Sequence, residues 1–193
     1  MFIKRKLNPK IKAEFSMFWG HQEIRFGTKF EETEMAVTKD SLIIRRYESR
    51  DKESVRNLHW LALSINTLVA NGPWDDGDLH DIQNEYLNKN GEFLVGVLNN
   101  KIVGMGALRK KTDKIGEIKL MRVHPDYQRR GYGQLILDKL EAKARQFGYL
   151  ILCLDTTTKQ VPAQNFYKRN GYHETHRAVI SYMETIFFEK HLE

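Results

Sequence analysis

Residues 117–140 read EIKLMRVHPDYQRRGYGQLILDKL, and this stretch decides the fold. It begins with a mostly apolar run, as a strand would, and Pro125 then stops the run because proline has no N–H for a sheet ladder. After Gly133, apolar residues recur at spacings of three and four until Gly148 supplies a helix stop. The sequence therefore predicts a strand, a glycine-bracketed turn and an amphipathic helix.

The turn between this strand and helix suits an anion. The first N–H groups of a helix lack backbone acceptors, and the helix dipole leaves partial positive charge there. Gly131 and Gly133 let the chain turn and allow a ligand to come close, while Arg129 and Arg130 add charge that suits a diphosphate. Two glycines alone are also compatible with a tight strand-to-helix connection, and that alternative stays open.

The longer pattern resembles the signature of the GNAT superfamily of N-acetyltransferases, which is Q/R-x-x-G-x-G/A after a strand ending V-x-P. Here Val123-His124-Pro125 is followed by Gln128 through Gly133. The resemblance implies that acetyl-CoA is the co-substrate, with its pyrophosphate on the backbone of the glycine turn and its pantetheine arm along the strand. The binding residues that it implies are Met121, Val123, Gln128, Arg129, Arg130, Gly131, Tyr132, Gly133 and Gln134.

Composition bounds the class of protein. The chain has 193 residues, of which 41% are hydrophobic, enough for one domain with a core. Cys153 is the only cysteine, which excludes an internal disulfide and favours a reducing compartment, so we expect a cytoplasmic location. Basic residues give a net charge of +6 but are interspersed with acidic ones, so we expect no nucleic-acid partner. No membrane span or signal peptide is recognisable, so we expect a soluble protein with no membrane partner.

Two segments are expected: an N-terminal extension at residues 1–38, which lacks clean periodicity, and a domain at residues 39–193. The extension is either an arm that packs on the domain or a partner, or a stretch upstream of a natural start at Met35. The order of elements after residue 41 is similar to the GNAT fold. The expected fold class is α/β, a mixed and mostly antiparallel twisted sheet with a central parallel strand pair and flanking helices.

Three local predictions fill in this fold. Asn99-Asn100 tolerates the positive φ of a two-residue hairpin turn. Asp78 is expected to cap a second helix that runs through Leu87. The apolar run Tyr149–Leu154 predicts a buried strand parallel to the strand that begins at Glu117.

A second family motif, N-x-x-A-x-x-x-Y-x-x-x-G-F, falls on Gln160, Ala163, Tyr167, Gly171 and Tyr172, with Gln and Tyr replacing its Asn and Phe. It implies that Gln160 contacts the cofactor, with Asn165 as a substitute. It also implies that Tyr167 donates a proton to the departing thiolate, which suits a phenol with a pKa of about 10. The alternative is that Tyr167 only belongs to the apolar face of a helix.

The reaction also needs a base, because a protonated amine has no lone pair for attack on a thioester. Glu117 lies fourteen residues before Gly131, the spacing of the catalytic glutamate in the histone-modifying branch of the superfamily. The alternative is that Glu117 is an exposed strand-end residue or only binds the amine. His124 and Cys153 are disfavoured as base and nucleophile, and the scattered histidines predict no metal.

The acceptor is expected at the loop Gly72–Asp81, where Trp74 and several aspartates would suit a cationic amine. Solvated aspartates are the alternative. The resulting prediction is an N-acetyltransferase that moves an acetyl group from acetyl-CoA to a small-molecule or peptide primary amine by direct attack in a ternary complex. Two alternatives stay open: a non-catalytic acyl-CoA-binding or regulatory module, and transfer of another acyl group. A homodimer is compatible with either.

Overall fold

The computed structural model describes residues 42–65 and 77–193, apart from the side chains of residues 64 and 65. The described residues belong to the second of two units into which the chain divides, residues 38–193. The predicted extension and Met35 therefore lie outside the described residues, and the domain boundary stays a prediction. The strands are β1 (Ile43–Arg46), β2 (Glu92–Leu98), β3 (Lys101–Lys110), β4 (Ile115–Val123), β5 (Ile151–Thr157), β6 (His173–Ile180) and β7 (Met183–His191). The helices are α1 (Lys52–Ile65), α2 (Tyr132–Gln146) and α3 (Val161–Arg169), with short turns η2 (Ser49–Asp51), η3 (Gly77–Leu79), η4 (Gln83–Leu87) and η5 (Pro125–Tyr127).

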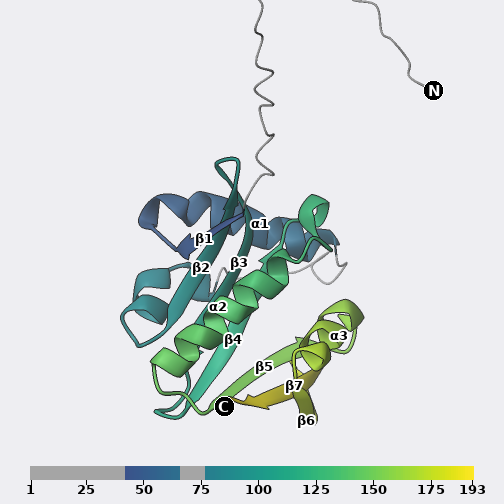
Figure 1. The fold of residues 1–193 in the computed structure, drawn as a ribbon. Coiled ribbons are helices and arrows are strands. Elements are labelled where there is room, and N and C mark those ends of the chain that lie inside the picture. The colour runs from purple at the N-terminus through teal and green to yellow at the C-terminus, as the bar shows by residue number, and fades with distance from the viewer. Residues whose placement is uncertain (1–41, 66–76) are drawn as a thin grey trace, which may run out of the picture. The chain divides into compact units, whose positions relative to one another are not determined.

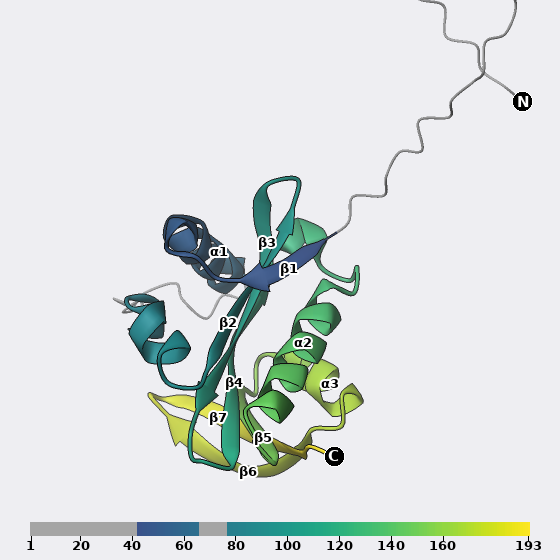
Figure 2. The same cartoon turned by 60° about the vertical axis from the view of Figure 1, so that its left-hand side comes forward.

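One seven-stranded sheet carries the fold, in the order β1-β2-β3-β4-β5-β7-β6. Neighbouring strands are antiparallel except for β4 and β5, which are parallel and joined through α2. The helices α1 and α2 lie on opposite faces of the sheet, and α3 lies on the same side as α2 (Figures 1 and 2). The expected mixed sheet with a central parallel pair is confirmed.

Each face of the sheet has its own core. The α2 side buries Ile136, Leu137 and Leu140, which follow the predicted helical spacing, against residues of β4 and β5 such as Ile118 and Leu152. The α1 side buries a second set, which consists of Tyr47, Val55, Leu58, Leu79, Ile82, Tyr86, Phe93, Val95, Met105 and Ala107. A side chain on β4 or β5 therefore points either to the α2 face or to the α1 face.

Local predictions hold where the turn chemistry is explicit. Asn99 and Asn100 have φ of 49° and 61° and close the β2–β3 hairpin, as expected. Gly148, with φ of +78°, follows the end of α2. The parallel strand predicted at Tyr149–Leu154 is confirmed as β5.

The second helix is different from its prediction. Instead of one helix capped by Asp78, the chain forms η3 and then the π-helical turn η4. Asp81 takes the capping role, because Asn84 donates to it from both its backbone N–H and its side-chain amide. The wider turn puts Tyr86 fully inside the α1-side core, which outweighs regular helical hydrogen bonding.

Among the described residues, no helix is long and apolar enough to cross a membrane.

Candidate functional site

β4 and β5 are hydrogen-bonded neighbours for only part of their length. Their register runs from Ile115 opposite Ile151 to Glu117 opposite Cys153, and no pairing follows. The rest of β4, residues 118–123, therefore leaves about 20 Å of strand edge without a β5 partner, at about 3.3 Å per residue. The two strands open a gap directly beyond Glu117.

The free edge of β4 points its backbone groups into this gap. The His124 N–H donates to the Val103 carbonyl on β3 at 2.8 Å, so Val123 and Met121, at alternate positions, face away from β3. Both carbonyls are engaged: Val123 O accepts from Gln128 Nε2 at 3.2 Å and Met121 O from Arg122 Nη1 at 2.9 Å. A ligand that pairs with this edge as a strand would displace those two side chains.

A β-bulge shapes the same edge. The β3–β4 register shifts so that Leu120 and Met121 together oppose Gly106, and Leu120 has φ of +53°. A leucine in this left-handed region is strained, so the surrounding structure must hold it there. Gly106 lies opposite the bulge, and a Cβ there would come within 2.5 Å of Met121 Sδ and 2.9 Å of Ile136 Cγ2, so neighbouring side chains would have to shift. Strain of this kind concentrates at functional sites.

The N-terminus of α2 has the open donors that the sequence predicts. The first backbone bond of this helix joins Leu135 N–H to the Gly131 carbonyl at 3.1 Å, and among the described residues the N–H groups of 129–134 donate to no carbonyl. Gly131 is needed for its φ of +83°, since a Cβ there would touch nothing within 4 Å. Arg129 also has a positive φ, of 59°. Several donors and the helix dipole therefore converge where an anion would bind.

The side chains around this turn are used mainly to hold it. Arg130 donates to the Asp126 carbonyl at 3.0 Å and lies over the Tyr127 ring. Gln134 bonds to Asp138 on its own helix and to Asn170 at the end of α3. Arg129 is exposed, and Tyr132 and Gly133 are half-buried. The backbone amides are thus the open donors, and the binding roles of these residues stay predictions.

α3 brings the second motif to the α2 side of the gap. Gln160 begins the helix, and its Oε1 accepts from Thr156 on β5 at 2.6 Å, whereas Asn165 is exposed. The side-chain carbonyl of Gln160, which the Asn of the family motif also has, is therefore already hydrogen-bonded to β5. Whether Gln160 or Asn165 contacts the cofactor stays a prediction.

Tyr167 is buried, with its ring edge-to-face against Phe166 and Tyr172. Its hydroxyl forms no hydrogen bond to any described residue, although the ring belongs to the core. Burial raises the pKa of Tyr167 to about 12, Asp155 adds to the rise, and Arg122 opposes it. The group is therefore a fully protonated phenol at neutral pH. The core alternative and the acid hypothesis are both compatible with this placement.

Glu117 lies on the α1 face in a network of charges. It stands opposite Arg109 on β3, whose Nε and Nη2 donate to its Oε2 at 3.0 and 2.6 Å. The Glu117 side chain is only 13% exposed, so Glu117 is not an exposed strand-end residue. Its Oε1 has no hydrogen bond to the described part of the chain. One oxygen of Glu117 is thus fixed by Arg109 and the other is available.

Asp78 closes this network instead of capping a helix. It accepts from the Tyr86 hydroxyl at 2.8 Å and pairs with Arg109 and Lys119, each at 3.3 Å. Burial pushes the pKa of Asp78 up, but Tyr86, Lys119 and Arg109 together outweigh it, so the pKa lies below its usual range. Of the predicted acceptor loop, residues 72–76, Trp74 included, lie outside the described residues.

Sequence reasoning missed two charged groups on this face. Asp155 follows the apolar run of β5 and shares the α1 face with Cys153 and Glu117 because strand residues alternate. Burial raises the pKa of Asp155, Lys119 opposes the rise and Glu117 adds to it. Arg122 is the second, beside Met121 on the free edge. The signal in each case was a charge that interrupts an apolar strand.

The other sequence candidates lie as expected or elsewhere. Cys153 is buried, its Sγ lies 3.6 Å from Lys111 Nζ, and burial raises the pKa of this thiol, which disfavours a thiolate nucleophile. His124 accepts from the Asp126 N–H at the turn after β4. In residues 42–65 and 77–193 no group of side chains has the make-up of a metal site.

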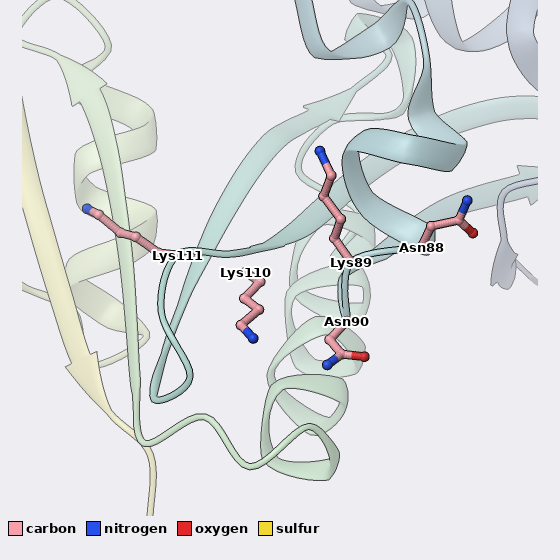
Figure 3. Close-up of a pocket in the computed structure, with 5 residues that line it drawn as sticks. All are labelled: Asn88, Lys89, Asn90, Lys110 and Lys111. Carbon is pink, nitrogen blue, oxygen red and sulfur yellow. The ribbon is translucent and has the colours of Figure 1, made fainter.

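A hollow of about 380 Å³ lies at the opposite end of β4 from the N-terminus of α2. It is lined by Asn88, Lys89, Asn90, Lys110 and Lys111, whose side chains diverge instead of converging on one point (Figure 3). Lys89 pairs with Glu85 and Lys110 with Asp113. This hollow therefore does not add to the site between β4 and β5.

Comparison with known proteins gives one family. A model described as the acetyltransferase (GNAT) family matches residues 52–172. The probable N-acetyltransferase camello of Xenopus tropicalis is 32% identical over 49% of this chain and 45% of its own, and N-acetyltransferase 8F1 of Rattus norvegicus is 31% identical over 58% and 57%. The chain thus spans about half the length of these curated relatives. The aminoalkylphosphonate N-acetyltransferase of Salmonella typhimurium is 32% identical over 47% of this chain and 62% of its own.

Solved structures agree on the fold. An acetyltransferase from Streptococcus agalactiae superposes with a TM-score of 0.72 at 22% identity, over 78% of this chain and 98% of its own. The PaiA N-acetyltransferase of Thermoplasma acidophilum, solved in complex with coenzyme A, superposes with a TM-score of 0.61 at 17% identity, over 79% and 99%. At these identities the likeness is one of fold.

Proposed function

Because the chain belongs to the GNAT acetyltransferase family, we propose that it is an N-acetyltransferase that moves an acetyl group from acetyl-CoA to a primary amine. The observation that carries this proposal is the gap itself: a free β4 edge that leads to the open N–H groups of α2. An extended arm with amides and a diphosphate at one end matches that arrangement in length and chemistry. The relatives are named as N-acetyltransferases, which supports an amine acceptor, and one of them is named for aminoalkylphosphonates.

Different residues would bind the diphosphate and the pantetheine arm of acetyl-CoA. The N–H groups of residues 129–134 receive the diphosphate, with Arg129 adjacent and free of ion pairs to described residues. Met121 and Val123 offer N–H and C=O groups to the pantetheine amides once Gln128 and Arg122 move from the two carbonyls. The thioester would then lie by the bulge at Leu120, between the two faces of the sheet. Gln160 and Asn165 stay candidates for further contacts on the α2 side.

Two proton transfers complete direct attack in a ternary complex. On the α1 face, Glu117 accepts a proton from the ammonium through its available Oε1, which frees the nitrogen lone pair. The nitrogen attacks the thioester carbon, the C–S bond breaks, and Tyr167 donates its proton to the departing sulfur. The second proton that the nitrogen loses replaces the one that Tyr167 gave to sulfur, and Glu117 releases the first proton to solvent, so that one proton leaves for each acetyl group transferred. We also propose a cytoplasmic location, because a single cysteine favours a reducing compartment.

The test joins calorimetric titration with acetyl-CoA and CoA to thiol release over a panel of amines in the same sample. We expect micromolar binding and acetyl-CoA-dependent thiol release with at least one class of amine. Binding without thiol release for every amine would favour the non-catalytic module. Absence of binding would overturn the proposal, because it would contradict the anion site at residues 129–134.

A further inference from the structure

Arg122 lies between Met121 and Val123, whose backbone groups face the gap. Its own side chain points to the α1 face, where the acceptor would bind. It is paired across the sheet with Met105, which belongs to the α1-side core. Cross-strand partners share a face, so Arg122 projects to the same side as Glu117 and Asp155 and away from α2. The diphosphate site at the start of α2 is on the other side of the sheet.

The guanidinium of Arg122 is poorly satisfied where it lies. Its one hydrogen bond to the described part of the chain runs from Nη1 to the Met121 carbonyl at 2.9 Å, and its buried Nε has no partner there. Burial lowers the pKa of Arg122, opposed by Tyr167. No carboxylate among the described residues pairs with it. A buried cation in this state costs folding free energy, and a ligand that supplies an anion would recover that cost.

Three other arginines on strands of the sheet show what Arg122 lacks. Arg45 pairs with Asp51 at 2.6 Å, Arg46 with Glu92 at 2.7 Å and Arg109 with Glu117 at 2.6 Å. Hydrogen bonding to the carboxylate raises the pKa of Arg45 and Arg46. Burial lowers the pKa of Arg109, but the bond to Glu117 and the charges of Glu117 and Asp78 together outweigh it, so the pKa of Arg109 is also raised. Each of these three guanidinium groups is paired with a carboxylate. By contrast, Arg122 has donors available on the face where the acceptor would bind.

A group of the opposite charge, the Asp155 carboxylate, lies on the same face of the sheet as Arg122. Asp155 on β5 has no hydrogen bond to the described part of the chain, while Glu117 and Lys119 act on its charge from β4. An amine held near Asp155 and Glu117 would have its other end free to reach toward β4. The gap face therefore presents groups of both signs that no described residue pairs with, one on each side of the opening.

We propose that Arg122 binds an acidic group of the acceptor, so that the substrate is an amine that also carries a carboxylate or phosphonate. This inference rests on the proposed acetyl transfer. The planar guanidinium forms two parallel bonds to either acid group, which would satisfy its donors and select the acceptor. Arg122 is then a specificity-determining residue.

The test compares short amines with and without an acid group, and adds spermidine as a longer polycation. 3-Aminopropylphosphonate and β-alanine are compared with 3-aminopropanol, propylamine and spermidine by thiol release at saturating acetyl-CoA. We expect the acid-bearing amines to have a kcat/KM at least tenfold above their neutral counterparts. Arg122→Gln should lower kcat/KM for them by about 10- to 100-fold, the scale of a charge-assisted bond, and for neutral amines by less than about threefold.

Controls separate this role from a structural one. Arg122→Lys should restore part of the preference, and Arg50→Gln, at a side chain that is 74% exposed and pairs with Glu48, should change nothing. Because the Arg122 Nε is buried and no carboxylate among the described residues pairs with the guanidinium, Arg122→Gln should keep or raise the melting temperature. An equal loss for all amines, a loss of stability that accompanies the loss of rate, or a preference for spermidine would each overturn the proposal.

A binding measurement decides the inference apart from catalysis. The protein in its CoA complex is titrated calorimetrically with 3-aminopropylphosphonate, with and without Arg122→Gln. Binding that depends on Arg122, with no thiol release from any amine, would sustain the anion site and refute acetyl transfer. Thiol release from neutral amines, with no Arg122-dependent binding of the phosphonate, would sustain acetyl transfer and refute the inference.

Discussion

Replacing Tyr167 with phenylalanine removes one oxygen atom that no described residue bonds, so stability and catalysis should respond in opposite ways. The ring keeps its edge-to-face contacts with Phe166 and Tyr172. Because the hydroxyl makes no hydrogen bond to a described residue, its removal breaks none of these bonds, and we expect the free energy of unfolding to stay constant or to rise by up to about 1 kcal/mol. For a protein of this size that is a rise in melting temperature of up to about 4 °C.

Turnover should fall in the same variant. A positioned general acid contributes about 10²- to 10⁴-fold, which is about 2.7–5.5 kcal/mol of the barrier. The pKa of Tyr167, about 12, means that the proton is present throughout an assay between pH 6 and 10, so no alkaline loss of rate should come from this group. The assay is thiol release at saturating acetyl-CoA and amine, with kcat as the readout.

Tyr172→Phe is the matched control. Its hydroxyl donates to Glu141 at 3.2 Å inside the core, so losing it should cost about 1 kcal/mol of stability and leave kcat unchanged. The two variants should therefore have opposite effects: Tyr167→Phe loses turnover and keeps stability, whereas Tyr172→Phe loses stability and keeps turnover. An unchanged kcat in Tyr167→Phe would refute the acid role and leave the residue as core packing. A drop in stability as large as that of Tyr172→Phe would show that the hydroxyl has a partner.

Four further predictions follow from single contacts. Gly131→Ala should lose about 1 kcal/mol of stability because its φ is +83°, and should also weaken acetyl-CoA binding, measured by melting and calorimetry. Gly133→Ala should weaken binding without loss of stability, since its added Cβ meets protein atoms only at ordinary distances of 3.6 Å and beyond. Glu117→Gln should lower kcat/KM by about 10²- to 10⁴-fold, the contribution of a positioned base; an unchanged kcat/KM would retire Glu117 as the base. The lowered pKa of Asp78 contributes stability above its unfolded pKa of about 4 that is lost as pH falls through the folded value, so Asp78→Asn should flatten acid unfolding below pH 4.

The elements that the sequence predicted well are those whose cause is local. Pro125 ends β4, Gly148 follows the end of α2, and Asn99-Asn100 turns the hairpin, because each residue restricts its own backbone. The open donors of α2 were predictable for the same reason, since a helix start after two glycines sets them. These features need no knowledge of what packs against them.

Features that depend on tertiary partners were not predictable. The placement of β7 between β5 and β6 is a matter of sheet order, and η4 adopts a wider turn because Tyr86 must reach the core. The ion pair between Arg109 and Glu117 needs the register of β3 on β4, which the bulge at Leu120 shifts by one residue. A one-residue shift changes which side chains share a face, so the charges of the gap could not be assigned from periodicity.

The distribution of buried charge separates stability from function in this fold. The carboxylates with the least exposure among the described residues are each satisfied: Asp51 by Arg45, Glu92 by Arg46, and Glu141 by Lys190. Arg122 departs from that pattern at the point where β4 and β5 separate. A fold that pairs its charges elsewhere gains nothing in stability from an unpaired guanidinium, and ligand binding would account for a group that breaks this local rule. On that argument, filling the gap with ligand should stabilise wild type by more than it stabilises Arg122→Gln, and equal stabilisation would remove the reason to connect Arg122 with binding.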